Sequence, residues 1–190
     1  MKTKTVTYAA VSAALILVAY TLDAWISRIG LPVRIAVLTL LVMLTLCISS
    51  EKWQLAVWVS TFFGITSFLY AWLLPDFVNM NGVWTSNFRN PLISVAPRVC
   101  IGFTAFFSYK GFCRLLPQKG WLAAALAAAV GVLTNTLLVC TMLGVFGSGD
   151  VFQKIAVTII SVNFVIEIAV NVLCVPVLVK GLKRARIFQR

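Results

Sequence analysis

The sequence predicts an all-α integral membrane protein with six transmembrane helices. Composition, apolar segments and charge distribution all support this. The chain of 190 residues is 61% hydrophobic and 11% charged, with a mean hydropathy of +1.00. Soluble domains are typically about 45–50% apolar and about 25% charged. We therefore expect a single membrane domain over residues 1–190, with no separate soluble domain.

Six apolar segments have about the length needed to cross a bilayer, which is roughly 20 residues. They cover Val6–Leu22, Pro32–Ser49, Trp53–Leu74, Pro91–Phe112, Trp121–Phe146 and Lys154–Val179. The second segment is the shortest. The first follows a basic start but has no convincing small-x-small cleavage site, so we expect it to remain as a span rather than be removed as a signal peptide.

Lysine and arginine positions predict the orientation of these spans. With a cytoplasmic N-terminus, the inner connections carry Lys2, Lys4, Lys52, Lys110, Arg114, Lys119, Lys180, Lys183, Arg184, Arg186 and Arg190. The outer connections carry only Arg28, Arg34, Arg89 and Lys154. The positive-inside rule therefore predicts that both termini are cytoplasmic. The net charge of +11 mostly reflects this topology, so we expect a lipid bilayer and no nucleic acid as partner.

The longest predicted outer connection lies between the third and fourth spans. It reads "PDFVNMNGVWTSNFRN", from Pro75 to Asn90, and is rich in asparagine, aromatic residues and turn formers. Loops of this length often act as lids or binding elements. The alternative is a surface loop with Trp84 and Phe88 at the membrane interface.

An arginine stands in the apolar fourth segment, within "NPLISVAPRVCIGFTAFF". Arg98 lies about 10 Å into this span, and a guanidinium keeps its charge inside a protein. Pro91 suits the first position of a helix. Pro97 is expected inside the helix, where it frees a carbonyl about one turn earlier and kinks the chain. We therefore expect a local polar pocket around Arg98, enclosed by protein or water.

A polar stripe is expected on the sixth span, because Asn163, Glu167 and Asn171 are four residues apart. Asn135 lies in the middle of the fifth span. Such residues face the interior of a bundle, where they either bond helices together, typically at about 0.6 kcal/mol per pair, or bind a ligand. Arg98 and Glu167 are the two ionisable residues expected within spans, and each could be the other's partner.

Most catalytic chemistry lacks its required residues. The chain has no histidine, and its five cysteines are scattered without a CxxC pair. Without histidine, a catalytic Ser/His or Cys/His pair is excluded. Without histidine or paired cysteines, a zinc or haem site is disfavoured. There is also no P-loop or Rossmann glycine pattern. We expect no enzyme activity, no cofactor and no metal, but a polar site beneath an outer loop, suited to a small polar ligand.

Small residues line the first span, in "TYAAVSAALILVAY". Ala9 and Ala13 are four residues apart, as are Ala10 and Ala14. This spacing lets another helix approach closely, either within the bundle or from a partner protein.

These features together resemble the substrate-binding S component of an energy-coupling factor (ECF) transporter. Six spans in about 190 residues, the alanine pairs and the long outer loop support the resemblance over most of the chain. The string "FRNPLISVAPRVCIGF", from Phe88 to Gly102, resembles the NPLxSVxPRxxxG signature of S components assigned to pantothenate.

The resemblance implies a bacterial cell-membrane protein that captures a vitamin near the outer surface. It implies that the subunit docks on a transmembrane T subunit through Ala9, Ala10, Ala13 and Ala14. Two cytoplasmic ATPase subunits drive this T subunit. The S component then topples in the membrane to deliver its ligand and hydrolyses nothing itself.

Pantothenate carries a carboxylate, an amide, two hydroxyls and a geminal dimethyl group. The resemblance implies that Arg98 binds the carboxylate, with Arg89 as the alternative. The amide and hydroxyls would contact Asn135, Asn163 and Asn79 or Asn81, and Trp84 would cover the dimethyl group. Glu167 would orient Arg98, accept a ligand hydroxyl or be protonated.

Three alternatives remain. Another vitamin, such as a pyridoxine- or thiazole-type precursor, would use Glu167 as the hook for a cationic ligand. A structural or regulatory membrane subunit would use the polar stripe only to pack helices. A membrane enzyme is limited by the missing catalytic groups.

Overall fold

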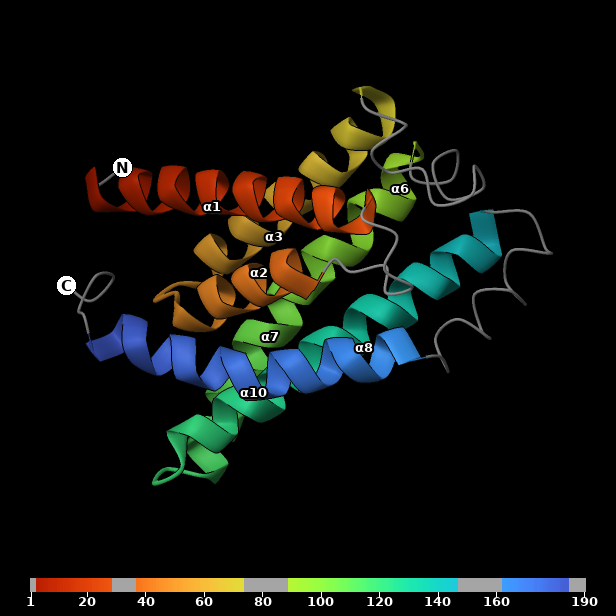
Figure 1. The fold of residues 1–190 in the computed structure, drawn as a ribbon. Helices are drawn as coiled ribbons and strands as arrows, with labels where there is room; N and C mark the ends of the chain where they lie inside the picture. Colours follow the sequence, from red (N-terminus) through yellow and green to blue (C-terminus); the bar gives the residue numbers. More distant parts are fainter. Residues whose placement is uncertain (1–2, 29–36, 74–88, 147–161, 185–190) are drawn as a thin grey trace.

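The computed structural model describes residues 3–28, 37–73, 89–146 and 162–184, and every regular element within them is a helix. The helices are α1 (Thr3–Arg28), α2 (Val37–Ser49), α3 (Trp53–Leu73), α6 (Pro91–Ser94), α7 (Ala96–Leu115), α8 (Gly120–Phe146) and α10 (Val162–Arg184) (Figure 1). Five spans are long and apolar enough to cross a membrane, with α6 and α7 forming one of them, and α2 is a shorter apolar helix of 13 residues. The prediction of an all-helical chain is confirmed, and of the six predicted spans the described residues contain five of membrane-crossing length and the shorter α2.

The observed bounds correct several predicted ones. Helix α1 continues past Leu22 to Arg28, and α10 continues past Val179 to Arg184. Apolarity alone ended both predicted spans too early. In α10 the long side chains of Lys183 and Arg184 let the helix continue into the membrane interface. In α1 the added segment contains Asp23 and Ala24, which are buried in the bundle. The fourth predicted span is broken at Val95 and ends at Leu115. Residues 32–36 and 154–161, assigned to the second and sixth predicted spans, lie outside the described part of the chain.

The short helix α2 lies at the centre of the bundle. It contacts α1, α3, α7, α8 and α10, and Figure 1 shows it between α1 and α10. Leu40, Met43 and Leu44 are fully enclosed. At 13 residues, α2 is too short to cross a bilayer by itself, and its apolar surface is covered on several sides by the longer helices.

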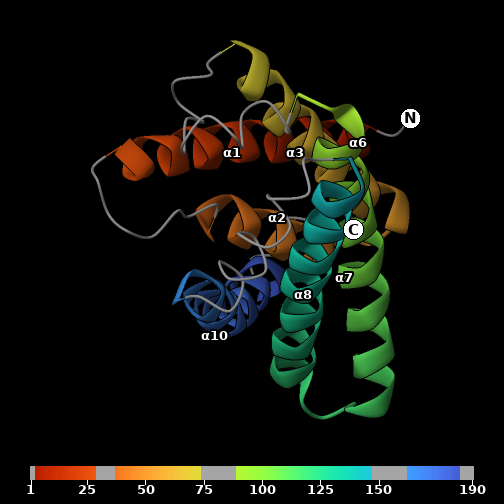
Figure 2. The same cartoon turned by 90° about the vertical axis from the view of Figure 1, so that its right-hand side faces the viewer.

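Helices α7 and α8 form the most extensive helix pair. They run antiparallel, side by side, and are joined by the short turn 116–119 (Figure 2). On its other side α7 packs against α3, where Gly102 lies directly against Ser60 and the Ala56 carbonyl. A larger residue at Gly102 would separate the two helices, so this glycine sets how closely α7 approaches α3.

The outer surface of the bundle is apolar. Val18, Leu173 and Val177 are more than half exposed, which would favour aggregation in water but suits contact with lipid. Exposed tryptophans lie near both ends of the helices, Trp25 and Trp72 at one end and Trp53 and Trp121 at the other. Tryptophan is enriched at both membrane interfaces, so this distribution also indicates a membrane protein. The start of α1 and the end of α10 lie at the same end of the bundle (Figure 1).

Candidate functional site

The bend between α6 and α7 positions the buried arginine. Asn90 caps α6 by accepting a hydrogen bond from the Leu92 N–H (3.0 Å), and Pro91 occupies the first turn, as the sequence predicts. The helix then breaks at Val95, and Pro97 stands in the first turn of α7. The sequence predicts Pro97 inside the helix, kinking it; the interruption is observed, but it lies at Val95 and puts Pro97 at the start of α7. Proline is tolerated in the first turn of a helix, where its missing N–H would have no acceptor within the helix. The break at Val95, two residues earlier, puts Pro97 in such a first turn.

Arg98 is anchored to the carbonyl that this bend exposes. Its side chain is only 7% exposed, and its Nη1 donates to the Ile93 carbonyl (3.0 Å). Ile93 stands four residues before Pro97, which has no N–H to offer that carbonyl. The expected freed carbonyl beside Arg98 is therefore observed, and the arginine donates a hydrogen bond to it.

Helix α3 supports the arginine from the side. The Arg98 guanidinium carbon lies 5.5 Å from the centre of the Phe63 ring, in range of a cation–π contact. One residue further along α3, a Cβ on Gly64 would lie 2.9 Å from the Val95 Cα and 3.3 Å from the Arg98 Cβ. Gly64 thus allows the bend to rest directly on α3, which fixes the position of Arg98.

Aromatic and ionisable groups from other helices complete a polar cluster, which we call the Arg98 cluster: Tyr20, Asp23, Phe63, Arg98 and Glu167. The Tyr20 ring lies 6.2 Å from Phe63 and 4.8 Å from the Tyr70 ring. The Tyr20 side chain of α1 and the Glu167 carboxyl group of α10 lie within electrostatic range of the Arg98 guanidinium. The cluster therefore gathers side chains of α1, α3 and α7 at one end of the bundle, with Glu167 facing them from α10, a helix that packs mainly against α2 and α8.

Asp23 is a buried carboxylate that the sequence interpretation missed. It is 5% exposed and accepts hydrogen bonds from the backbone N–H groups of Leu38 (3.2 Å) and Thr39 (2.8 Å) and from the Thr39 hydroxyl. These N–H groups belong to the first turn of α2, where a helix has no internal acceptors and favours negative charge. Asp23 on α1 thus caps α2. Helical spacing from the buried Tyr8, Ser12 and Ile16 could have identified it.

The predicted polar stripe is observed in part. Asn171 is fully buried, and its Nδ2 donates to the Glu167 carbonyl (2.8 Å) within α10. Glu167 is half-buried and belongs to the Arg98 cluster. Asn163 is the second residue of α10, but its side chain lies outside the described part of the structure. Asn135 is half-buried in α8, and its buried Oδ1 has no hydrogen-bond partner among the described residues.

The other predicted ligand residues precede α6 in the sequence. Arg89 is exposed, donates from Nε to the Ala71 carbonyl near the end of α3 (3.2 Å), and lies over the Trp72 ring (5.1 Å). It thereby connects the end of α3 to the start of α6. The predicted contacts of Asn79, Asn81 and Trp84 fall outside the described residues.

The alanine pairs of α1 differ in exposure. Ala10 and Ala14 are exposed, whereas Ala9 and Ala13 are half-buried at the edge of the contact with the bundle. The exposed pair lies on the face of α1 opposite Ile16, which is fully buried. Only Ala10 and Ala14 therefore present small residues directly to the surroundings.

Comparison with known proteins gives no family assignment, because neither the family models nor the curated proteins searched match the chain.

Proposed function

We propose that this protein is the substrate-binding S component of an ECF-type vitamin importer and that its ligand is pantothenate. The proposal places it in a bacterial cell membrane with both termini in the cytoplasm. The start of α1 and the end of α10 share one end of the bundle (Figure 1), as this proposal requires, and the lysine and arginine distribution is the reason for assigning that end to the cytoplasm. In this orientation the Arg98 cluster lies toward the outside of the membrane.

The burial and anchoring of Arg98 carry the proposal. A buried guanidinium stays protonated. Its positive charge must therefore be balanced by negative charge, either from neighbouring side chains or from a bound anionic ligand. The Ile93 carbonyl and the Phe63 ring fix its orientation. A fixed, planar, permanently charged fork is the group that proteins favour for binding a carboxylate in bidentate fashion.

The surroundings of Arg98 suit the rest of the ligand. Pantothenate needs groups that bond one amide and two hydroxyls, and apolar surface for its dimethyl group. The Tyr20 and Tyr70 side chains and Asn135 provide hydrogen-bonding groups in this half of the bundle, and Phe63 provides apolar surface. Glu167 would then orient Arg98 or accept a ligand hydroxyl.

Transport would require partners. In this proposal the exposed Ala10 and Ala14 of α1 form the docking face for a T subunit, and two ATPase subunits supply the energy. Small residues four apart let a partner helix approach closely within a membrane. The half-buried Ala9 and Ala13 would lie at the edge of that contact.

The test is equilibrium binding of pantothenate to the purified protein in detergent, by calorimetry, with pyridoxine and thiamine as controls. We expect tight 1:1 pantothenate binding, and a loss on the order of 100-fold or more in Arg98→Ala, because removing one partner of a buried charge pair costs about 2–5 kcal/mol. Arg98→Lys should fall between the two, since it keeps the charge and loses the fork. Arg184→Ala, an exposed arginine in the last turn of α10, is the matched control.

Each result bears on a specific part of the proposal. Unchanged pantothenate affinity in folded Arg98→Ala would exclude Arg98 as the anion hook, and loss in Arg89→Ala alone would transfer that role to Arg89. Absence of pantothenate binding by folded wild-type protein would refute the vitamin assignment. A thermal unfolding curve for each variant establishes that it is folded.

One observation favours a second candidate. The Arg98 cluster contains two carboxylates, Asp23 and Glu167, beside one guanidinium. A cationic ligand, such as a pyridoxine- or thiazole-type precursor, would use Glu167 as its hook. Binding of such a ligand, lost in Glu167→Gln and retained in Arg98→Lys, would establish this alternative over pantothenate.

A further inference from the structure

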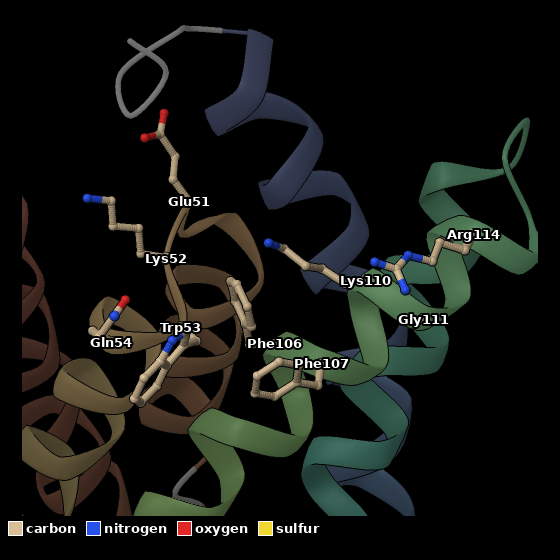
Figure 3. A pocket seen from close by; sticks show the side chains of 9 residues that line it. All are labelled: Glu51, Lys52, Trp53, Gln54, Phe106, Phe107, Lys110, Gly111 and Arg114. Atoms are coloured by element: carbon tan, nitrogen blue, oxygen red, sulfur yellow. The ribbon is translucent and has the colours of Figure 1, made fainter.

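A cavity of about 490 Å³ opens at the opposite end of α7 from Arg98. It lies between the α2–α3 turn, residues 50–52, and the last turns of α7 (Figure 3). Its walls combine basic and aromatic side chains, including Lys52, Trp53, Phe106, Phe107, Lys110 and Arg114. We call this cavity the basic pocket.

The charges at the basic pocket favour an anion. Lys52, Lys110 and Arg114 are all exposed, and Glu51 is the one acid among the residues that line the cavity. Figure 3 shows Lys110 and Arg114, one turn apart on α7, extending toward the α2–α3 turn, whereas Glu51 extends away from them. The Lys110 ammonium lies 4.5 Å from the centre of the buried Phe106 ring. This cation–π contact holds the ammonium at the wall of the pocket.

A strip of exposed aromatic rings runs from the pocket along the outside of α3 and α7. The Trp53 ring stacks on Phe103 at 5.6 Å, and Phe103 stacks on Phe107 at 6.3 Å with the ring planes 5° apart. All three side chains are more than a third exposed. Phe103 lies one turn closer to Arg98 than Phe107, so the strip leads from the charged end of the bundle toward its middle. Charge followed by an apolar track matches a phospholipid headgroup followed by an acyl chain.

We propose that the basic pocket binds the phosphate headgroup of an anionic phospholipid, with one acyl chain lying along the Trp53–Phe103–Phe107 strip. The assignment rests on the orientation given under the proposed function, which places this end at the cytoplasmic leaflet, where anionic lipids attract basic residues. It does not depend on which ligand Arg98 binds. The aromatic strip favours a lipid over a soluble phosphate, since a soluble phosphate leaves the strip unused.

The test is lipid retention by native mass spectrometry of the purified full chain. Phosphatidylglycerol, phosphatidylcholine and soluble glycerol 3-phosphate are titrated separately. The pocket variant is Lys110→Gln/Arg114→Gln, and the matched control is Lys119→Gln/Lys180→Gln, which removes the same charge at exposed positions outside the lining. Basic contacts near an anionic surface contribute about fivefold each. We therefore expect the pocket variant to lose roughly 25-fold in phosphatidylglycerol binding and the control to keep it.

Two further comparisons separate the headgroup from the acyl chain. Phe107→Ala, at an exposed position, should weaken phosphatidylglycerol binding while leaving the thermal unfolding midpoint unchanged. Wild-type protein should bind phosphatidylglycerol more tightly than either phosphatidylcholine or glycerol 3-phosphate. Pantothenate binding should be unaffected in Lys110→Gln/Arg114→Gln, so failure here is distinct from failure of the proposed function.

Equal retention of phosphatidylglycerol and phosphatidylcholine would overturn the proposal, because the basic residues would then not distinguish an anionic headgroup from a zwitterionic one. An equal loss in the control variant would show general charge attraction instead of a site. Glycerol 3-phosphate binding as tightly as the lipid would assign the pocket to a soluble phosphate.

Discussion

The capping of α2 by Asp23 gives the sharpest stability prediction. In Asp23→Ala, the N–H groups of Leu38 and Thr39 and the Thr39 hydroxyl lose their acceptor at a buried position. Loss of a helix cap costs about 0.5–2 kcal/mol, and each buried donor left without an acceptor costs about 1–3 kcal/mol. Some of these terms overlap, so we expect a loss of about 3 kcal/mol in the free energy of unfolding.

Two further variants divide that cost. Asp23→Asn keeps one carbonyl oxygen as an acceptor but loses the charge that the start of α2 favours, so we expect about half the loss. Thr39→Val removes only the hydroxyl donor and should cost about 1 kcal/mol. Because Thr39 and Asp23 share a hydrogen bond, the double variant Asp23→Ala/Thr39→Val should be little worse than Asp23→Ala alone.

The assay is the apparent thermal unfolding midpoint in detergent at a fixed scan rate. For a chain of this size, 1 kcal/mol shifts the midpoint by about 2–4 °C, so Asp23→Ala should lower it by about 10 °C. Glu51→Ala, an exposed acid in the α2–α3 turn, is the matched control and should leave the midpoint unchanged. A midpoint for Asp23→Ala equal to that of Glu51→Ala would refute the capping argument.

Two other predictions concern the bend and the docking face. Gly64→Ala adds a Cβ 2.9 Å from the Val95 Cα, so it should displace the bend and weaken pantothenate binding about tenfold by calorimetry; Gly111→Ala, with open space around it, should not. Binding retained in Gly64→Ala would mean that the bend tolerates the shift. Ala10→Trp and Ala14→Trp should keep ligand binding but stop uptake by cells that contain the full complex, and persistent uptake would exclude this face of α1 as the docking surface.

The local chemistry of the bend could be predicted from the sequence. The sequence predicts Pro91 at the start of a helix, and it occupies the first turn of α6, whereas the capping role of Asn90 emerged only from the structure. Proline lacks an N–H wherever it stands, so the pairing of Arg98 with a freed carbonyl did not depend on knowing where the helix breaks. The exact position of the break, at Val95, could not be predicted, because the sequence does not show that Gly64 of α3 packs against this point of the chain.

Contacts between distant helices escaped prediction for a related reason. Asp23 follows Leu22, where the apolar run ends, so apolarity alone assigned it to a loop. Its role appears only when α1 continues to Arg28 and the start of α2 lies beside it. The basic pocket likewise joins Lys52 to residues of α7, and the sequence placed all of these only on the same side of the membrane.

Helix α1 connects the two proposed activities, because its opposite faces serve different ones. Its exposed face presents Ala10 and Ala14, the proposed docking surface. Its buried face contributes Tyr20 and Asp23 to the Arg98 cluster, and Asp23 also bonds the start of α2. A partner that shifts α1 by docking would therefore act directly on a helix that lines the ligand site. Docking and ligand retention are then linked through one rigid helix, without a separate relay between them.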